Sequence, residues 1–184
     1  MKHYSFEFIQ ECERGGKQAQ KKLFETLYAP MFRVCLRYVN QNADAEDCLM
    51  RGFLKMFQNL STFRFEGEHS LFVWVRRIMV NEALMFLRKK HNFLISIDSE
   101  VEDIAIPNEI IQQIEAEDLI RKISSLPTGY RTVFNLYVIE GYLHQEIAEL
   151  LGISENTSRT QLSKARIKLK KMLEEEKEVQ NVSR

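Results

Sequence analysis

Apolar side chains recur every three to four positions along most of the chain, which is the period of a helix with one buried face. The pattern predicts helices over residues 5–14, 19–40, 44–60, 70–87, 108–124, 128–140, 143–151 and 154–176. Pro30 predicts a kink or a short break in the second helix, and Asp44 and Ser70 are typical N-caps of the third and fourth. Only residues 93–97 show a weak strand-like alternation, so the expected fold class is all-α.

The 184 residues carry no net charge, but the charges are unevenly distributed. Residues 1–90 hold 15 Lys and Arg against 10 Asp and Glu, residues 91–118 hold none against 8, and residues 119–184 hold 11 against 8. Two basic blocks therefore flank one acidic segment, and basic blocks suit a polyanionic partner. We expect two small helical domains, 1–91 and 119–184, joined by an acidic linker, 92–118, for which a solvated spacer is the simplest explanation.

The chain has no apolar run near the ~18–20 residues that a membrane span needs, and its first ten residues lack the pattern of a signal peptide. Its three cysteines, Cys12, Cys35 and Cys48, form an odd set without Cys-x-x-Cys spacing, so reduced thiols are expected. We therefore predict a cytoplasmic protein without membrane insertion.

The strongest local motif runs from Gly141 to Arg166. Residues 145–148 begin a short helix, Gly152 suits the positive φ of a tight turn, and Ser154 suits the N-cap of a second helix. This spacing is typical of a helix-turn-helix.

The second helix of this motif has two faces. Leu162, Ala165 and Leu169 are expected to face the core. The residues expected to face outward are Arg159, Thr160, Ser163, Lys164 and Arg166. Six basic residues and no acidic one occur from Asn156 to Met172, which favours a helix that enters the DNA major groove. The alternative is a helical hairpin with a solvated basic face.

Two further stretches allow two interpretations each. Residues 61–90 place Phe63, Arg64 and Phe65 before a helix that carries Trp74 and a basic end, which suits single-stranded nucleic acid through stacking and phosphate contacts. Aromatic residues at helical spacing are also typical of a core. Residues 44–60 are acidic at their start and apolar later, which fits either a core helix or a partner surface.

The order of these motifs resembles the sigma-70 family of bacterial RNA polymerase sigma factors. Ala45-Glu46-Asp47-Cys48, Gly52 to Phe57 and Phe72 to Glu82 are similar to the family's core- and promoter-binding region. Leu126-Pro127-x-Gly129-Tyr130-Arg131 and Glu146 to Arg166 are similar to its C-terminal helix-turn-helix. The two-domain length resembles the extracytoplasmic-function subgroup. The resemblance implies a subunit that binds core RNA polymerase and directs promoter-specific initiation, with no cofactor and no enzymatic activity.

The resemblance also implies three sets of contact residues. Those for the clamp helices of the polymerase's largest subunit are Asp44, Glu46, Asp47, Phe53, Met56 and Phe57. Those for melted, single-stranded DNA at the minus-ten element are Phe63, Arg64, Ser70, Trp74, Arg76, Arg77, Asn81, Arg88 and Lys89. Those for duplex DNA at the minus-thirty-five element are Thr157, Ser158, Arg159, Thr160, Gln161, Ser163, Lys164 and Arg166. Ser158 departs from the family pattern, which often has an aliphatic residue there. An anti-sigma factor is a further implied partner, and the linker would follow the RNA exit path.

Two other classes of protein fit part of the pattern. A dimeric helix-turn-helix regulator would use residues 1–118 as an effector or dimerisation domain and bind a palindrome unaided. An enzyme would need a catalytic or metal cluster, yet His3, His69, His91 and His144 are scattered and no His-x-x-x-His motif occurs. No metal site is predicted.

Overall fold

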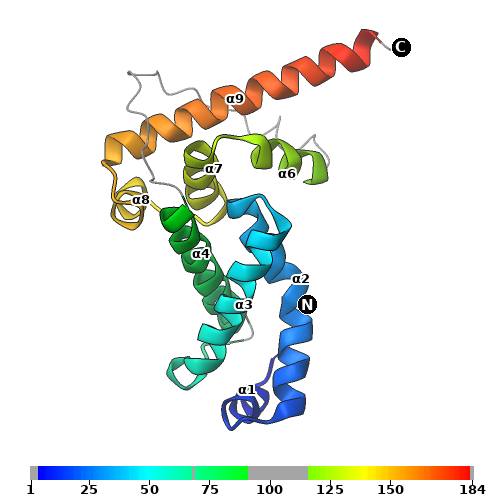
Figure 1. Cartoon of the computed structure of the whole chain (residues 1–184), viewed down its shortest axis with the longest axis vertical. Coiled ribbons are helices and arrows are strands. Elements are labelled where there is room, and N and C mark those ends of the chain that lie inside the picture. Colours follow the sequence, from blue (N-terminus) through cyan, green and yellow to red (C-terminus); the bar gives the residue numbers. More distant parts are fainter. Residues whose placement is uncertain (1–3, 68, 91–115, 183–184) are drawn as a thin grey trace. The chain divides into compact units, whose positions relative to one another are not determined.

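The computed structural model describes residues 4–67, 69–90 and 116–182, and the chain divides into two compact units, Met1–Asn92 and Phe93–Arg184 (Figure 1). Every regular element within the described residues is a helix, which confirms the predicted all-α class. The predicted linker up to residue 115, the strand-like residues 93–97 and the start of the helix predicted over 108–124 lie outside the described residues.

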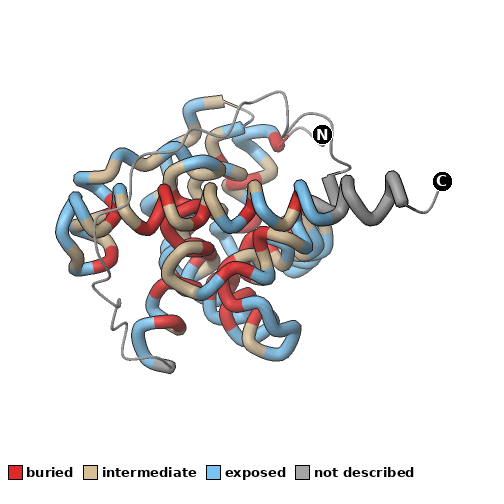
Figure 2. Tube along the Cα trace, turned by 90° about the horizontal axis from the view of Figure 1, so that it is seen from above, coloured by how far each residue is buried: buried red, intermediate tan, exposed pale blue. Residues whose placement is uncertain are grey.

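Three long helices form the body of the N-terminal unit. They are α2 (Lys17–Val39), α3 (Asn42–Gln58) and α4 (Ser70–Lys90), and each packs against the other two. The short helix α1 (Phe6–Glu13) packs on α2, and the 3-10 turn η1 (Leu60–Thr62) follows α3. Their apolar faces meet in a core, drawn in red in Figure 2, whose largest fully buried side chains are Leu23, Leu27, Met31, Tyr38, Leu49, Met56, Leu71 and Met79.

Two local expectations for this unit are wrong, and so is one half of a third. Helix α2 continues through Pro30, so the break is wrong and the kink stays a prediction; packing outweighs the loss of one backbone hydrogen bond. Helix α3 is preceded by Gln41 as N-cap, and Asp44 lies in its first turn, where a carboxylate favours the positive end of the helix dipole. Ser70 is the first residue of α4, and its hydroxyl bonds to the loop before it.

The C-terminal unit is built on one long helix, α9 (Glu155–Val182), against which α6 (Ala116–Ser125), α7 (Thr128–Phe134) and α8 (His144–Leu151) pack. The helix predicted over 128–140 is in fact α7 followed by a π-helical turn, η2 (Asn135–Ile139). The buried Arg131 donates to the carbonyl oxygens of Ser124 and Leu126 at 3.0 and 2.8 Å, which joins α7 to the end of α6. Burial lowers the pKa of this guanidinium group.

All three cysteines are buried and free, as the sequence predicts. Burial raises the pKa of Cys12 and Cys48 to about 11 and that of Cys35 to about 12, because desolvation disfavours the thiolate. At neutral pH these thiols are therefore protonated members of the core.

Candidate nucleic-acid interface

A tight turn joins α8 to α9. Gly152 ends α8 with φ of 68°, a conformation that favours glycine, and its amide donates to the carbonyl oxygen of Ala148 at 2.9 Å. Ser154 accepts a hydrogen bond from the Thr157 amide at 3.0 Å and so caps α9. The predicted helix-turn-helix and its cap are both confirmed.

The side chains of α9 fall on two faces. Leu162, Ala165 and Leu169 are buried, as predicted. Of the eight residues assigned to the minus-thirty-five element, those exposed or half-exposed are Thr157, Arg159, Thr160, Lys164 and Arg166. Arg159 is paired with Glu155 one turn earlier, on the surface. Its guanidinium is free to exchange this partner for DNA at little cost, because exposed pairs contribute little to stability.

The other three residues of that set do not face outward. Ser158, Gln161 and Ser163 are 0%, 6% and 2% exposed, so the expectation that Ser163 faces outward is wrong, and the assignment of the three residues to DNA stays a prediction. The buried face of α9 is wider than its apolar residues indicate, because α7 and α8 both pack on it. Gln161 fills the space beside Gly129 at the start of α7, where an added Cβ would lie 2.9 Å from Gln161 Oε1.

Two further exposed residues extend the outward side of α9. Asn156 and Lys168 are exposed and lie one turn before Thr160 and one turn after Lys164. The four residues form a stripe at a spacing of four along the outward side of the helix. That spacing can be read from the sequence.

The loop before α4 is held against the N-terminal unit. Phe63 packs against Trp74 with ring centroids 5.1 Å apart, and Phe65 packs against Phe6 at 6.0 Å. The Ser70 hydroxyl donates to the Gly67 carbonyl oxygen at 2.6 Å. The two loop aromatics are therefore half-buried and ordered by packing rather than fully exposed.

Cationic and polar side chains line the outward face of α4. Arg77, Asn81, Arg88 and Lys89 are exposed, as is Arg64 in the loop, while Trp74 and Arg76 are half-buried. Arg77 and Asn81 lie one turn apart and share a face. The arrangement brings together aromatic rings for stacking and cations for phosphates within one unit.

Helix α3 presents a different surface. Glu46 and Asp47 are exposed, and Asp44 and Phe57 are half-exposed. Phe53 and Met56 are buried, so they are not available to a partner, and Phe53 packs against Phe24 of α2 at 4.6 Å. Their assignment to polymerase contact stays a prediction that their burial in this structure does not support.

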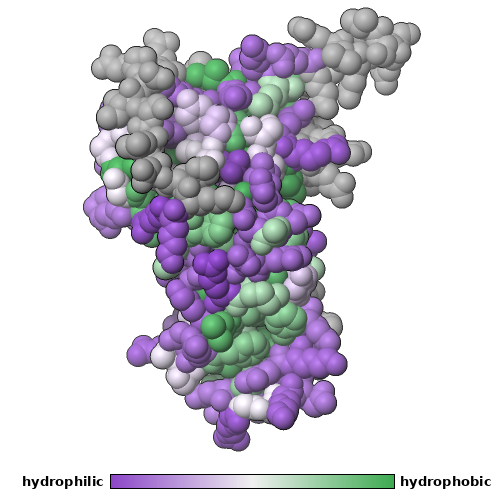
Figure 3. Space-filling view, viewed as in Figure 1, coloured by the Kyte–Doolittle hydropathy of each residue, from purple (hydrophilic) through white to green (hydrophobic). Residues whose placement is uncertain are grey.

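The predicted contact set omits the apolar residues that α3 does expose. Met50 is 45% exposed and Leu54 is 60% exposed, and they lie one turn apart. Figure 3 shows hydrophobic side chains gathered on the surface over α2 and α3. We name Glu46, Met50, Leu54 and Phe57 the α3 face. Helix α3 has more apolar residues than one buried face can hold, and this excess in the sequence indicates that some of them are exposed.

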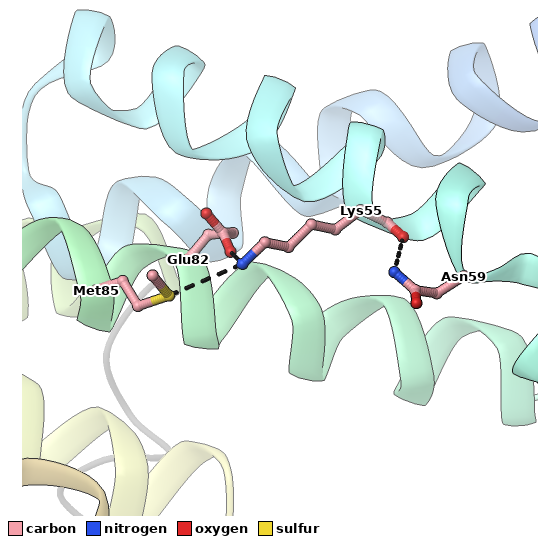
Figure 4. A network of polar contacts seen from close by, with 4 residues as sticks. All are labelled: Lys55, Asn59, Glu82 and Met85. Atoms are coloured by element: carbon pink, nitrogen blue, oxygen red, sulfur yellow. Dashed lines mark hydrogen bonds and ion pairs between the residues drawn. The ribbon is translucent and has the colours of Figure 1, made fainter.

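An ion pair joins α3 to α4 (Figure 4). Lys55 of α3 pairs with Glu82 of α4, whose side chain is only 5% exposed, and the Lys55 ammonium also lies 3.8 Å from the Met85 sulfur. Asn59 donates to the Lys55 carbonyl oxygen at 2.8 Å at the end of α3. The α3 face and the outward face of α4 therefore belong to one packed body.

Comparison with known proteins identifies the family. The family model described as sigma-70 region 2 matches residues 23–93, and the one described as sigma-70, region 4 matches residues 116–169. The extracytoplasmic-function (ECF) sigma-E factor of Haemophilus influenzae is 26% identical over 171 residues, which cover 86% of this chain and 89% of that protein. The sigma factor SigV of Bacillus subtilis is 29% identical, with 81% and 90% covered.

A solved structure shares the fold. The sigma factor RpoE from Bartonella quintana, crystallised with the anti-sigma factor NepR, matches with a TM-score of 0.50 and 19% identity over 84% of this chain and 96% of that chain. The chain belongs to the sigma-70 family of RNA polymerase sigma factors. Within it, the chain is a member of the two-domain extracytoplasmic-function subgroup. It binds core RNA polymerase and directs promoter-specific initiation through minus-ten and minus-thirty-five contacts.

Two features are absent from the described residues. No helix there is both long and apolar enough to cross a membrane. No group of three or more His, Cys, Asp or Glu side chains in the described ranges is placed to hold a metal ion.

Proposed function

We propose that three helix faces of this sigma factor each bind a different partner. The α3 face, with Asp47 beside it, docks on the clamp helices of the polymerase's largest subunit. Helix α4 and the loop before it capture melted minus-ten DNA, and α9 enters the major groove at the minus-thirty-five element. The chain contributes binding rather than catalysis, needs no cofactor and acts in the cytoplasm.

The outward stripe of α9 is the observation that carries this proposal. Asn156, Thr160, Lys164 and Lys168 follow one another at single-turn spacing, directly after a capped helix start. Short polar side chains near the start of a recognition helix reach base edges, and longer cations reach guanine or phosphate oxygens. No acidic side chain occurs between Asn156 and Met172 to repel the DNA backbone.

The N-terminal unit supports the minus-ten assignment through its pairing of rings and cations. Extruding a base from a duplex costs a few kcal/mol, which stacking and phosphate contacts must offset. Trp74 and Phe63 offer half-exposed rings, and Arg64, Arg77 and Arg88 offer exposed cations. Both kinds of contact are available on one body.

The α3 face supports the docking assignment because exposed apolar side chains lie beside carboxylates. Burying Leu54 and Met50 against a partner removes apolar area from water, and Glu46 and Asp47 add charge selectivity. We extend the proposal to an anti-sigma factor, which would compete with polymerase for such surfaces. Membership of the subgroup supports this partner.

The test of the α9 assignment uses holoenzyme reconstituted from the full chain and core polymerase, with a promoter library randomised at minus-thirty-five. Lys164→Ala should cost about 1–3 kcal/mol of binding free energy at the preferred sequence. It should also relax the preference at one base position, because a contact to a base edge determines which base is preferred. Lys168→Ala should weaken all sequences alike and lower the salt slope of binding by about one phosphate contact.

Lys171→Ala is the matched control, because Lys171 lies two turns beyond Lys164 in the same helix and is 77% exposed beside Glu175. It should leave the preference unchanged. If Lys164→Ala and Lys171→Ala behave alike, α9 does not read the element in the way proposed.

A further inference from the structure

A polar contact is buried where the two helices of the helix-turn-helix meet. Ser158, in the first turn of α9, is 0% exposed, and its hydroxyl oxygen lies 2.8 Å from Nδ1 of His144, the first residue of α8. A hydroxyl removed from water loses about 1–3 kcal/mol unless it finds a partner. The contact therefore ties the start of the recognition helix to the start of the helix before it.

The imidazole of His144 also packs against an aromatic ring. Tyr137 of η2 stacks on it with centroids 4.4 Å apart and planes 21° from parallel. The guanidinium carbon of Arg166, further along α9, lies 6.0 Å from the centre of the same Tyr137 ring. One stack of side chains thus connects η2, α8 and α9.

Helix α9 is attached to this stack at two points. Ser158 and Arg166 are eight residues apart, which is about 12 Å along a helix axis. Two attachments separated along an axis restrain both the rotation and the tilt of a helix. Thr160 and Lys164, the central residues of the outward stripe, lie between the two attachment points.

We propose that His144 and Ser158 are positioning residues for minus-thirty-five recognition, which fix the angle at which α9 presents Thr160 and Lys164 to the groove. The inference rests on the proposed function of α9. Neither side chain touches DNA. Their effect arises because hydrogen bonds to base edges weaken steeply when donor and acceptor move beyond 3.5 Å or out of line, so a small tilt changes which bases are preferred.

Four single variants separate the hydrogen bond from the packing. Ser158→Ala removes the hydroxyl, whereas Ser158→Thr keeps it. His144→Phe keeps a ring for Tyr137 and removes the nitrogen, whereas His144→Asn keeps a polar atom near the position of Nδ1. The double variant His144→Phe with Ser158→Val replaces the polar contact by an apolar one and buries no unpaired polar atom.

Each full-length variant is reconstituted with core polymerase and tested on promoter libraries randomised at minus-thirty-five or at minus-ten, after a circular-dichroism melt has verified folding. For Ser158→Ala and His144→Phe, the ratio of initiation between the best and the next-best minus-thirty-five sequence should change at least fivefold. The minus-ten preference should stay within twofold. Ser158→Thr and His144→Asn should keep the minus-thirty-five ratio within twofold of the wild-type value.

The opposite results overturn the inference. A merely structural role would lower initiation from all sequences alike and leave the minus-thirty-five ratio unchanged. If Ser158→Ala or His144→Phe fails to fold, the double variant decides, since a wild-type ratio there refutes positioning by the polar contact. Lys164→Ala distinguishes failure of this inference from failure of the proposed role of α9. If Lys164→Ala changes the minus-thirty-five ratio and the His144 and Ser158 variants do not, only this inference is refuted. If none of these variants changes the ratio, the proposed role of α9 is refuted.

Discussion

Removing Lys55 should destabilise the N-terminal unit more than neutralising Glu82, although the two side chains form one ion pair. Glu82 is 5% exposed and Lys55 is 47% exposed. Lys55→Met leaves a buried carboxylate without its cation. Glu82→Gln leaves an ammonium group that can turn into water and an amide oxygen that can still accept a hydrogen bond.

The magnitudes follow from these exposures. Stranding a fully buried charge costs about 3–5 kcal/mol, and water entering at the half-exposed Lys55 position lowers this to about 2 kcal/mol. Glu82→Gln should cost about 0.5 kcal/mol, the value of a partly exposed pair. The double variant should cost about 1 kcal/mol, because its buried group is neutral. Adding the second substitution to Lys55→Met should therefore raise stability.

Trp74 makes the measurement specific. It is the only tryptophan in the chain and lies on α4, so its fluorescence during urea unfolding follows the N-terminal unit alone. The free energy of unfolding should fall in the order wild type, Glu82→Gln, double variant, Lys55→Met. If Glu82→Gln is as destabilised as Lys55→Met, or if the double variant is no more stable than Lys55→Met, the buried-charge argument is wrong.

Two other results are expected. Leu54→Asp should weaken binding to core polymerase at least tenfold in a binding titration. Val73→Asp, at a similarly exposed apolar position on α4 (62%), should leave that affinity within twofold. Equal losses for the two variants would reject the α3 face as the docking surface. The thiols should resist an aromatic disulfide reagent at pH 7 in the folded chain and all react in denaturant. Because their pKa values lie above the ordinary 9.0, the folded chain binds these protons more tightly, and stability should decrease as pH rises above 9; rapid labelling of the folded chain at pH 7 would contradict their burial.

Local patterns predicted most of the helices and the turn between α8 and α9. Helical periodicity, the Ser154 cap and the positive φ of Gly152 are set by neighbouring residues, and each was correct. The break at Pro30 was wrong because packing against α3 and α4 overrides one lost hydrogen bond, and no local pattern contains that information.

The candidate sites were harder to predict because they depend on which side of each helix is covered. Ser158 is polar and was expected to face DNA, but its partner is His144, fourteen residues earlier and in another helix. On α3, Phe53 and Leu54 are equally apolar neighbours, and only the position of α2 decides that the first is buried and the second exposed. Residue type pointed to particular helices, and tertiary packing decided which of their residues are accessible.

The central claim is that this chain directs core RNA polymerase to promoters, and in vitro transcription on a promoter library tests it most directly. Purified chain is added to cognate bacterial core polymerase, and the 5′ ends of the transcripts are sequenced. Initiation should appear at defined start sites only when the chain is present. The DNA upstream of these start sites should share two separated sequence elements. Failure of the chain to associate with core polymerase, together with no start site that depends on it, would contradict the account.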